Sequence, residues 1–401
     1  MKILMVTPYV PYPPSSGGQI RTYNLLKYLS QNNEITLVAL YKNDEEKKYE
    51  SYLKKYCRKI YLCKRPSSPW QFKNIFKTIF SSSPFLVVRN YSDEAKTIIN
   101  ELLSKEKFDV IHAETFYVMP HIPQTNVPIV LVEQTIEYKV YKHFVNSLPF
   151  YLRLLIYFDI DIIKLKYWER FYWKKANAVV VVSSSDEKLI KNEEPLLKTS
   201  IIPNCVGDEM IIDKLGKKDL ESPTIFFQGN FFWLQNVEAA KFIINKIYPQ
   251  LIKELSHVKI VIAGQNAKKL GSLIDKNINI INIEPDNINK VKKLFRENTL
   301  FIAPIFGPGG TRLKILAAMG SGMPVISSVT GIEGLEVTNN INIVIANNQQ
   351  EFVTKIKQLL ANKNLYEKIR NNAYKLIKEK YQWSQTAKEL ESVYKNLKKI
   401  Q

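Results

Sequence analysis

The chain has 401 residues, of which 45% are hydrophobic and 24% charged, which suits two packed domains of ordinary globular type. No purely apolar run is long enough to span a bilayer, the first residues are typical of a buried strand and not of a signal peptide, and the three cysteines fit neither a metal site nor a disulfide framework. We therefore expect a cytoplasmic protein. The net charge of +19 permits an anionic membrane, an anionic substrate or nucleic acid, but the absence of zinc-finger, RNA-recognition and basic-zipper motifs disfavours nucleic acid.

Short β-branched runs alternate with amphipathic stretches through the first half of the chain. In the stretch 19–30, Ile20, Leu25, Leu26 and Leu29 recur near helical spacing. Strand, helix and strand in this rhythm indicate a parallel sheet with helices on both faces. The predicted strands of this half are 2–6, 35–40, 108–113, 128–132 and 178–183.

The same rhythm restarts after a polar stretch, which predicts a second open α/β domain. We place the boundary near residue 206, giving domains 1–205 and 206–380. Ligands of such sheets bind beyond the carboxyl ends of the strands, so two facing domains are expected to bind theirs in a cleft. The predicted strands of this half are 224–229, 258–264, 278–283, 299–304, 323–328 and 341–346.

A glycine pair follows the first predicted strand. Gly17 and Gly18 precede a helix, where backbone N–H groups and the helix dipole favour an anion. An ordinary glycine turn before a helix is the alternative interpretation.

A second glycine-rich loop follows the strand 299–304. Thr311 is placed as the N-cap of the next helix, with Arg312 and Lys314 in its first turn. Cations there oppose the helix dipole at a cost of about 0.3 to 1 kcal/mol unless an anion lies nearby. Together with the backbone donors of Gly309 and Gly310, they predict a diphosphate cradle; a solvated basic helix end is the alternative.

With these motifs in place, the sequence resembles the family 4 retaining glycosyltransferases of the glycosyltransferase-B fold over nearly its whole length. The resemblance implies two facing Rossmann-like open parallel-sheet domains and a last helix, 381–401, that crosses back to the first domain. It also implies sugar transfer from a nucleotide-diphosphate donor, held mainly by the second domain, to an acceptor on the first. The matching segments are "MVTPYVPYPPSSGGQIRTYNLLKYL", "FDVIHAE", "ANAVVVVSSSDEKLI", "IIPNCV", "FFQGNFFWLQNVEAAKFI", "APIFGPGGTRLKILAAMGSGMPVISSVTGIEGL" and "YQWSQTAKELESVYKNL".

The chain departs from this family at its Glu-x7-Glu element, whose second Glu binds the donor ribose in many members. The corresponding positions are Gly309 and Ala317, and neither is acidic. Ala317 follows Lys314 by three residues, so we expect it to share the face assigned to the phosphates and to point into the cleft. The basic pair that is frequent after the first strand of the second domain is replaced by "GNFFWLQN", from Gly229 to Asn236.

The resemblance implies chemistry without a covalent enzymic nucleophile and without a metal or other cofactor. Arg312 and Lys314 would hold the leaving diphosphate. His112 and Glu114 are expected at a strand end facing the cleft, where one of them orients the sugar or the acceptor; a hydrogen-bonded core position is the alternative for His112. The remaining donor-binding candidates are Gly17, Gly18, Gly229, Asn230, Gly309, Gly310, Thr311, Glu333 and Gly334.

A segment rich in basic and aromatic residues runs from Lys139 to Lys175. It carries eight Lys or Arg against three Asp or Glu, a composition that suits a membrane interface. A helix packed on its own domain, with lysine stems along its surface, is the alternative.

These observations predict a hexosyl-type glycosyltransferase of cell-surface polysaccharide assembly at the inner face of the membrane. Its partners would be a nucleotide sugar and a glycan or lipid-linked acceptor. A catalytically weakened scaffold of the same fold, a nucleotide-sugar epimerase and a basic nucleic-acid binder are the alternatives.

Overall fold

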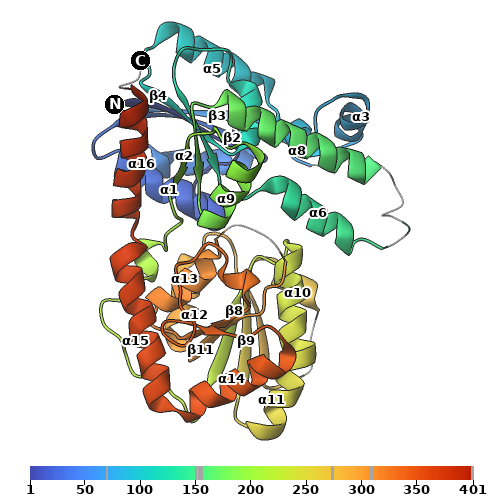
Figure 1. Cartoon of the computed structure of the whole chain (residues 1–401), viewed down its shortest axis with the longest axis vertical. Coiled ribbons are helices and arrows are strands. Elements are labelled where there is room, and N and C mark those ends of the chain that lie inside the picture. Colours follow the sequence, from blue (N-terminus) through green and yellow to red (C-terminus); the bar gives the residue numbers. More distant parts are fainter. Residues whose placement is uncertain (69–70, 150, 152–156, 272–274, 308–310, 399–401) are drawn as a thin grey trace. The chain divides into compact units, whose positions relative to one another are not determined.

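The computed structural model describes residues 1–68, 71–149, 151, 157–271, 275–307 and 311–398. The chain divides into two compact units (Figure 1). The first comprises Met1–Pro14, Gly18–Pro203 and Thr386–Gln401, and the second comprises Ser15–Gly17 and Asn204–Gln385. The boundary predicted from the sequence lies between Cys205 and Val206, two residues beyond the break that follows Pro203.

The first unit is built on a parallel sheet with the strand order β3-β2-β1-β4-β5-β6-β7. Its central strands are buried on both faces, as the apolar run from Ile3 to Val6 illustrates with no exposed residue. The strands are β1 (Lys2–Thr7), β2 (Glu34–Tyr41), β3 (Lys59–Lys64), β4 (Val110–Glu114), β5 (Ile129–Glu133), β6 (Ala178–Val181) and β7 (Thr199–Ile201).

Helices cover both faces of this sheet (Figure 1). Ile111 and Ala113 of β4 face a core that includes residues of α5 and α8, whereas His112, on the opposite face, contacts α16. Local signals fix several helix starts: the Ser92 side chain accepts from the Ala95 N–H at the start of α5. The helices are α1 (Gly17–Leu29), α2 (Glu50–Leu53), α3 (Phe72–Phe80), α4 (Phe85–Asn90), α5 (Asp93–Lys105), α6 (Glu137–Ser147), α8 (Tyr157–Lys175), α9 (Ser184–Glu193) and, from Thr386 onward, α16 (Trp383–Lys398).

The second unit has a parallel sheet with the strand order β10-β9-β8-β11-β12-β13. Its core is aromatic near the centre, where Phe226 packs edge-on against Phe295 and Phe301. The elements are β8 (Thr224–Gln228), α10 (Leu234–Phe242), α11 (Tyr248–Glu254), β9 (Lys259–Gly264), β10 (Ile278–Asn282), α12 (Ile288–Glu297), β11 (Leu300–Ala303), α13 (Leu313–Gly320), β12 (Val325–Ser327), β13 (Val344–Ile345), α14 (Gln349–Ala361) and α15 (Lys363–Lys380).

Every strand predicted from a β-branched run is present, and the expectation of two parallel-sheet domains is confirmed. Two strands were missed. Lys59–Lys64 has basic ends and a half-exposed middle, and Thr199–Ile201 is only three residues long. Both strands lie at the edges of the sheet, where each pairs with only one neighbour. Edge strands are less buried than central strands, so their sequences are less apolar. None of the helices among the described residues has the length and hydropathy of a membrane-spanning segment.

Candidate functional site

The strand order of the second unit reverses direction between β8 and β11. The chain runs from β8 outward to β9 and β10, and then returns to the other side of β8 with β11. Loops that leave the carboxyl ends of strands at such a reversal diverge, and ligands of open α/β sheets bind there. The loops after β8, β9 and β11 therefore define the candidate site of this unit.

Two glycines bring the loops after β8 and β9 into direct contact. Gly264 has a φ of +147°, and a Cβ on it would lie 1.8 Å from the carbonyl oxygen of Gly229. A Cβ on Gly229 would in turn lie 2.9 Å from Cγ of Asn236, on α10. Only glycine permits this close approach, so these two positions fix the shape of the loop.

Side-chain amides hold the same loops together. Asn230 Oδ1 accepts from the Phe232 N–H (3.0 Å) and from Asn266 Nδ2 (2.8 Å). Asn230 Nδ2 donates to Gln265 Oε1 (3.1 Å), and Gln265 Nε2 donates to the carbonyl of Ser15 (3.0 Å). Hydrogen bonds of Asn230, Gln265 and Asn266 thus join the loops after β8 and β9 at the switch point. We call these three side chains the amide rim.

Lys314 extends from the first turn of α13 to this rim. Its Nζ donates to Asn236 Oδ1 (2.6 Å) and lies 4.8 Å from the ring centroid of Phe227, while Asn236 Nδ2 donates to the carbonyl of Asn230 (2.8 Å). Burial and the charge of Arg312 lower the pKa of Lys314 to about 7. The Lys314 ammonium contacts an amide oxygen and a ring face, and no carboxylate among the described residues pairs with it.

Arg312 places a second cation beside the first. Its Nη2 donates to the carbonyl of Gly307 (2.8 Å), and its buried Nε has no hydrogen-bond partner among the described residues. Burial lowers the pKa of Arg312 to about 10, and the charge of Glu333 opposes that shift. The buried hydroxyl of Thr311 is likewise without a partner in this part of the chain. Two desolvated cations and free donors form a site that an anion would stabilise.

The first unit has its own strand-order reversal, between β1 and β4, and a buried polar network lies beside it. Residues 112 and 114 are two apart on β4 and share a face of the sheet. His112 Nε2 lies 2.6 Å from Glu114 Oε2, and His112 Nδ1 lies 2.6 Å from the hydroxyl of Tyr394, on α16. Gln134 Nε2 donates to Glu114 Oε1 (2.6 Å), and Arg21 Nε lies 3.7 Å from that oxygen.

The charges of this network balance one another. Burial opposes ionisation of Glu114, but the hydrogen bond of His112 and the charges of His112 and Arg21 outweigh it, so the pKa of this carboxyl lies below its ordinary value. His112, Glu114 and Arg21 are completely buried. Tyr9 and Gln134, joined by a hydrogen bond of 2.9 Å, are the half-buried members of the network.

Comparisons with known proteins agree with this two-unit architecture. Residues 222–362 match the family model described as glycosyl transferases group 1. Over 100% of both chains, the structure resembles sucrose-phosphate synthase from Thermosynechococcus elongatus, with a TM-score of 0.70 at 12% identity. It also resembles HepE from Anabaena, solved in complex with UDP-glucose, with a TM-score of 0.64 at 11% identity over 99% of this chain and 100% of that one. The chain has the glycosyltransferase-B fold, and its residues 222–362 are similar to the group 1 glycosyl transferases.

A sequence relative covers nearly the whole chain. A 44.6 kDa protein in the cps region of Klebsiella pneumoniae is 25% identical over 395 residues, which is 95% of this chain and 96% of that protein. The amide rim and both cations of the second unit lie inside the matched residues 222–362.

The structure brings four of the predicted donor-binding residues together. Gly229 and Asn230 lie in the loop after β8, and Asn236 connects that loop to Lys314, the second residue of α13. Arg312 immediately precedes this helix. Sequence reasoning did not include Asn236, Gln265 and Asn266 among the site residues. Gln265 and Asn266 directly follow a predicted strand, and that position was a signal that could have found them; Asn236 lies within α10 and left no such signal.

The predicted start of α13 was wrong by one position. Arg312, not Thr311, occupies the N-cap, and no side chain caps the helix. The carbonyl of Thr311 accepts from the Leu313 N–H and that of Arg312 from the Ile315 N–H, so the helix begins at Leu313. An arginine side chain has no acceptor atom, so it cannot cap the first N–H groups of α13.

The remaining predicted donor-binding residues do not lie in one place. Glu333 is exposed and ends a short helical turn, with Gly334 at a φ of +79° beside it. Gly17 lies in the second unit, where an added Cβ would be 3.8 Å from Leu313 Cδ1, whereas Gly18 packs against Tyr9 in the first unit. Two further predicted residues, Gly309 and Gly310, lie outside the described residues.

Burial contradicts the expectation that Ala317 points into a cleft, and the environment of His112 matches the alternative of a hydrogen-bonded core position. Ala317 is only 8% exposed, because α13 packs on β11 and β12 and is also in contact with α15. Although Ala317 shares a helical face with Lys314, its side chain is too short to reach the surface. His112 and Glu114 do not face open space either, because Arg21, Gln134 and Tyr394 of the same unit surround them.

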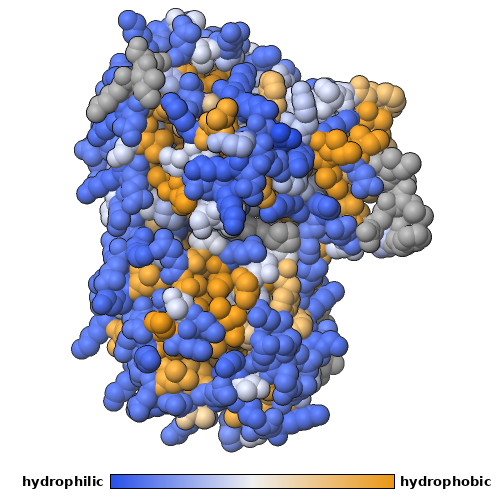
Figure 2. Space-filling model, in the orientation of Figure 1, coloured by the Kyte–Doolittle hydropathy of each residue, from blue (hydrophilic) through white to orange (hydrophobic). Residues whose placement is uncertain are grey.

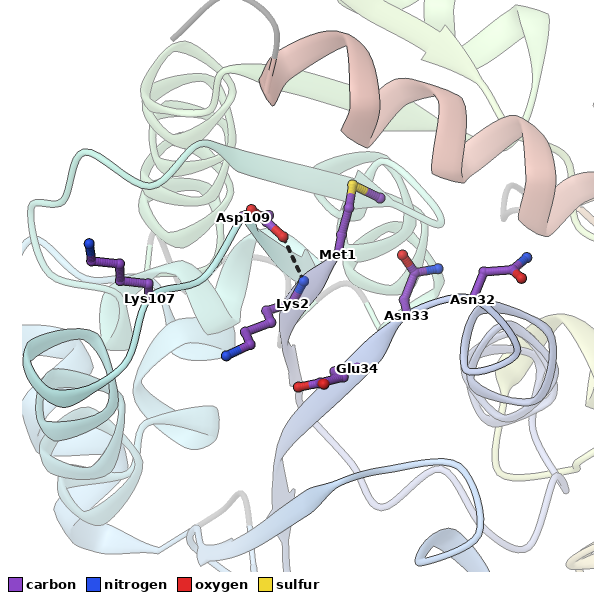
Figure 3. Close-up of a pocket in the computed structure, with 7 residues that line it drawn as sticks. All are labelled: Met1, Lys2, Asn32, Asn33, Glu34, Lys107 and Asp109. Carbon is purple, nitrogen blue, oxygen red and sulfur yellow. Dashed lines mark hydrogen bonds between the residues drawn. The ribbon is translucent and has the colours of Figure 1, made fainter.

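A surface hollow of the first unit lies at the other end of its sheet (Figure 3). The Lys2 N–H donates to Asp109 Oδ2 across it (2.7 Å). It adjoins the amino ends of β1 and β2, away from the carboxyl ends at which α/β sheets bind ligands. Its lining residues are Met1, Lys2, Asn32, Asn33, Glu34, Lys107 and Asp109. Within the described ranges, no group of three His, Cys, Asp or Glu is arranged to hold a metal ion.

Proposed function

We propose that this protein is a retaining glycosyltransferase that moves a hexosyl unit from a nucleoside-diphosphate sugar to a glycan or lipid-linked acceptor in cell-surface polysaccharide assembly. The observation that carries the proposal is the pair of desolvated cations, Arg312 and Lys314, at the switch point of the glycosyltransferase domain. Two related observations support it: HepE was solved with UDP-glucose, and the Klebsiella pneumoniae relative belongs to a cps region.

The proposed role of the cations is to stabilise the leaving group. When the bond between the anomeric carbon and the diphosphate breaks, negative charge grows on the diphosphate oxygens. The Arg312 guanidinium offers a planar fork to phosphate and the Lys314 ammonium a point charge, which together replace the charge neutralisation that a metal would give. We therefore propose that donor binding needs no metal, and that treatment with EDTA leaves it unchanged.

On the acceptor side, the buried network of the first unit suggests positioning rather than direct chemistry. His112 and Glu114 are enclosed, so we assign them the task of orienting Gln134 and Tyr9, which are half-buried. A tyrosine hydroxyl and an amide are suitable partners for a sugar hydroxyl of the acceptor. The reaction is proposed to take place in the cytoplasm, at the inner face of the membrane.

A nucleotide-sugar-binding scaffold is the second candidate function. Neither Gly309 nor Ala317 supplies the carboxylate of the Glu-x7-Glu element, and Ala317 is buried. In this alternative the diphosphate cradle persists and turnover does not. An epimerase is less favoured, because the family model that matches this chain is one of glycosyl transferases.

Thermal unfolding with UDP, GDP and their sugars tests the proposal. A ligand at 100 times its dissociation constant should raise the free energy of unfolding by about 2.7 kcal/mol. The expected result is stabilisation by at least one nucleotide sugar, followed by slow hydrolysis in which water takes the place of the acceptor and the free nucleoside diphosphate is released. Stabilisation without release, even when glycan or lipid-linked acceptors are added, supports the scaffold. No stabilisation across the panel refutes the nucleotide-sugar site.

A further inference from the structure

Helix α3 of the first unit has its polar side buried and its apolar side exposed. Asn74 and Thr78 are buried, and the Thr78 hydroxyl donates to the carbonyl of Asn74 (2.7 Å). Phe72, Phe76 and Phe80 are 92%, 67% and 72% exposed. Their spacing of four residues places the three rings on one face of the helix. This is the reverse of a helix that packs its apolar face on a protein core.

Hydrogen bonds from α8 hold α3 in this orientation. Lys164 Nζ donates to the carbonyls of Thr78 (2.8 Å) and Ser81 (2.6 Å), at the end of α3. Trp168 Nε1 donates to the carbonyl of Ser82 (2.9 Å) one turn further along α8. The exposure of the three phenylalanines is therefore built into the packing of the unit.

The apolar surface continues along α8. Ile160, Ile163, Tyr167 and Phe171 are exposed at a spacing that places them on one face of this helix. Figure 2 shows hydrophobic side chains gathered on the part of the first unit that carries α3 and α8. We call the exposed side chains of α3 and α8 together the α3/α8 face.

The α3/α8 face carries exposed positive charge, which favours an anionic partner. Lys73 and Lys77 are exposed between the phenylalanines, and α3 contains no acidic residue. By contrast, two lysines of α8 are paired: Lys166 Nζ lies 3.0 Å from Glu193 Oε1, and Lys174 Nζ lies 2.9 Å from Glu194 Oε1. The positive charge of Lys73 and Lys77 is not balanced by any acidic residue of α3. This differs from the sequence-based interpretation, which counted the lysines of the segment 139–175 equally.

We propose that the α3/α8 face docks this protein on an anionic lipid bilayer. Helix α3 would lie in the plane of the interface, with its phenylalanines at the acyl boundary and Lys73 and Lys77 at the level of the lipid phosphates. Exposed aromatic residues with intervening lysines are the composition of such interfacial helices. The inference does not depend on the proposed enzymatic activity.

Co-sedimentation of the full chain with vesicles tests the proposal. The chain should sediment with vesicles of phosphatidylcholine and phosphatidylglycerol and much less with phosphatidylcholine alone. The triple variant Phe72→Ser/Phe76→Ser/Phe80→Ser should lower the partition coefficient by about tenfold or more, because it removes the inserted side chains. Lys73→Gln/Lys77→Gln should remove the preference for phosphatidylglycerol and the sensitivity to salt.

The control is Leu196→Ser, which removes an apolar side chain of the same unit that is 98% exposed. It should sediment like the wild type. Melting temperatures of all variants should stay close to that of the wild type, because the replaced side chains are solvated. Absence of sedimentation of the wild type, or equal sedimentation of the triple variant, would overturn the proposal. It would also be overturned by a wild-type dimer that ignores vesicles and that the triple variant converts to a monomer.

Discussion

The two strand-order reversals of the molecule both hold charged side chains, but they differ in how the charge is balanced. In the first unit, Glu114 lies among His112, Arg21 and Gln134, so opposite charges and donors meet within the protein. In the second unit, burial lowers the pKa of both Lys314 and Arg312, the charge of Arg312 lowers that of Lys314 further, and Glu333 opposes only the shift of Arg312. A balanced network contributes to folding, whereas an unbalanced pair is stabilised by a ligand.

Removing Glu114 should have the largest effect on stability. Glu114→Ala leaves Arg21 and His112 buried without their carboxylate, and breaking a buried ion pair costs about 3 to 5 kcal/mol. Chemical denaturation should show this loss in the free energy of unfolding. The matched control is Glu101→Ala on α5, whose exposed side chain pairs with Lys105; it should change stability by about 0.5 kcal/mol or less. Equal effects of the two variants would contradict a balanced network.

Gly264→Ala should destabilise the second unit, because it disrupts the close contact between the loops after β8 and β9. The φ of +147° alone costs roughly 1 to 3 kcal/mol for a residue with a Cβ, and the clash with the Gly229 carbonyl adds to it. Gly216 provides the control, because nothing lies within 4 Å of a Cβ added there. Gly216→Ala should be neutral or stabilise by up to about 1 kcal/mol. If both variants unfold at the same denaturant concentration, the close contact between the loops is not as described.

Arg312→Ala should separate binding from stability. Loss of a charge-assisted hydrogen bond should weaken binding of a nucleoside-diphosphate sugar by about 1.5 to 3 kcal/mol, measured by calorimetry. The melting temperature of the free protein should not fall, because the residue removed is a half-buried cation whose Nε has no hydrogen-bond partner among the described residues. Arg296→Ala, on the exposed face of α12, is the control and should bind like the wild type. Unchanged affinity of Arg312→Ala would remove this residue from the site.

The sequence predicted the strands of both sheets, except the edge strands β3 and β7, and it singled out the two cations near the start of α13, because those features are local. Runs of β-branched residues identify β1, β2 and β9 without knowledge of their neighbours. Arg312 and Lys314 were found because two cations near a helix start conflict with the helix dipole. Both signals span only a few consecutive residues.

Contacts between distant parts of the chain could not be predicted in this way. The bond between His112 and Tyr394 joins residues 282 positions apart, and the bond between Lys314 and Asn236 joins residues 78 apart. Neither leaves a mark in local composition. For α3, periodicity predicts which residues share a face, but only the packing of Lys164 on its end shows that the phenylalanine face is the exposed one.

The central claim is that a diphosphate balances the charge of the two cations of the second unit, and the pH dependence of donor binding tests this claim most directly. In the free protein, burial and Arg312 lower the pKa of Lys314 to about 7, and a bound diphosphate should raise it again. Above that pH, Lys314 must take up a proton when the donor binds. The affinity is therefore highest below about pH 7 and declines as the pH rises.

Calorimetric titration with the nucleotide sugar should therefore show a dissociation constant that rises from about pH 7 to about pH 8.5, by up to about tenfold per pH unit. Lys314→Arg keeps its charge over this range, so its dissociation constant should stay flat. A wild-type dissociation constant that does not change with pH, or the same pH dependence in Lys314→Arg, would contradict the account.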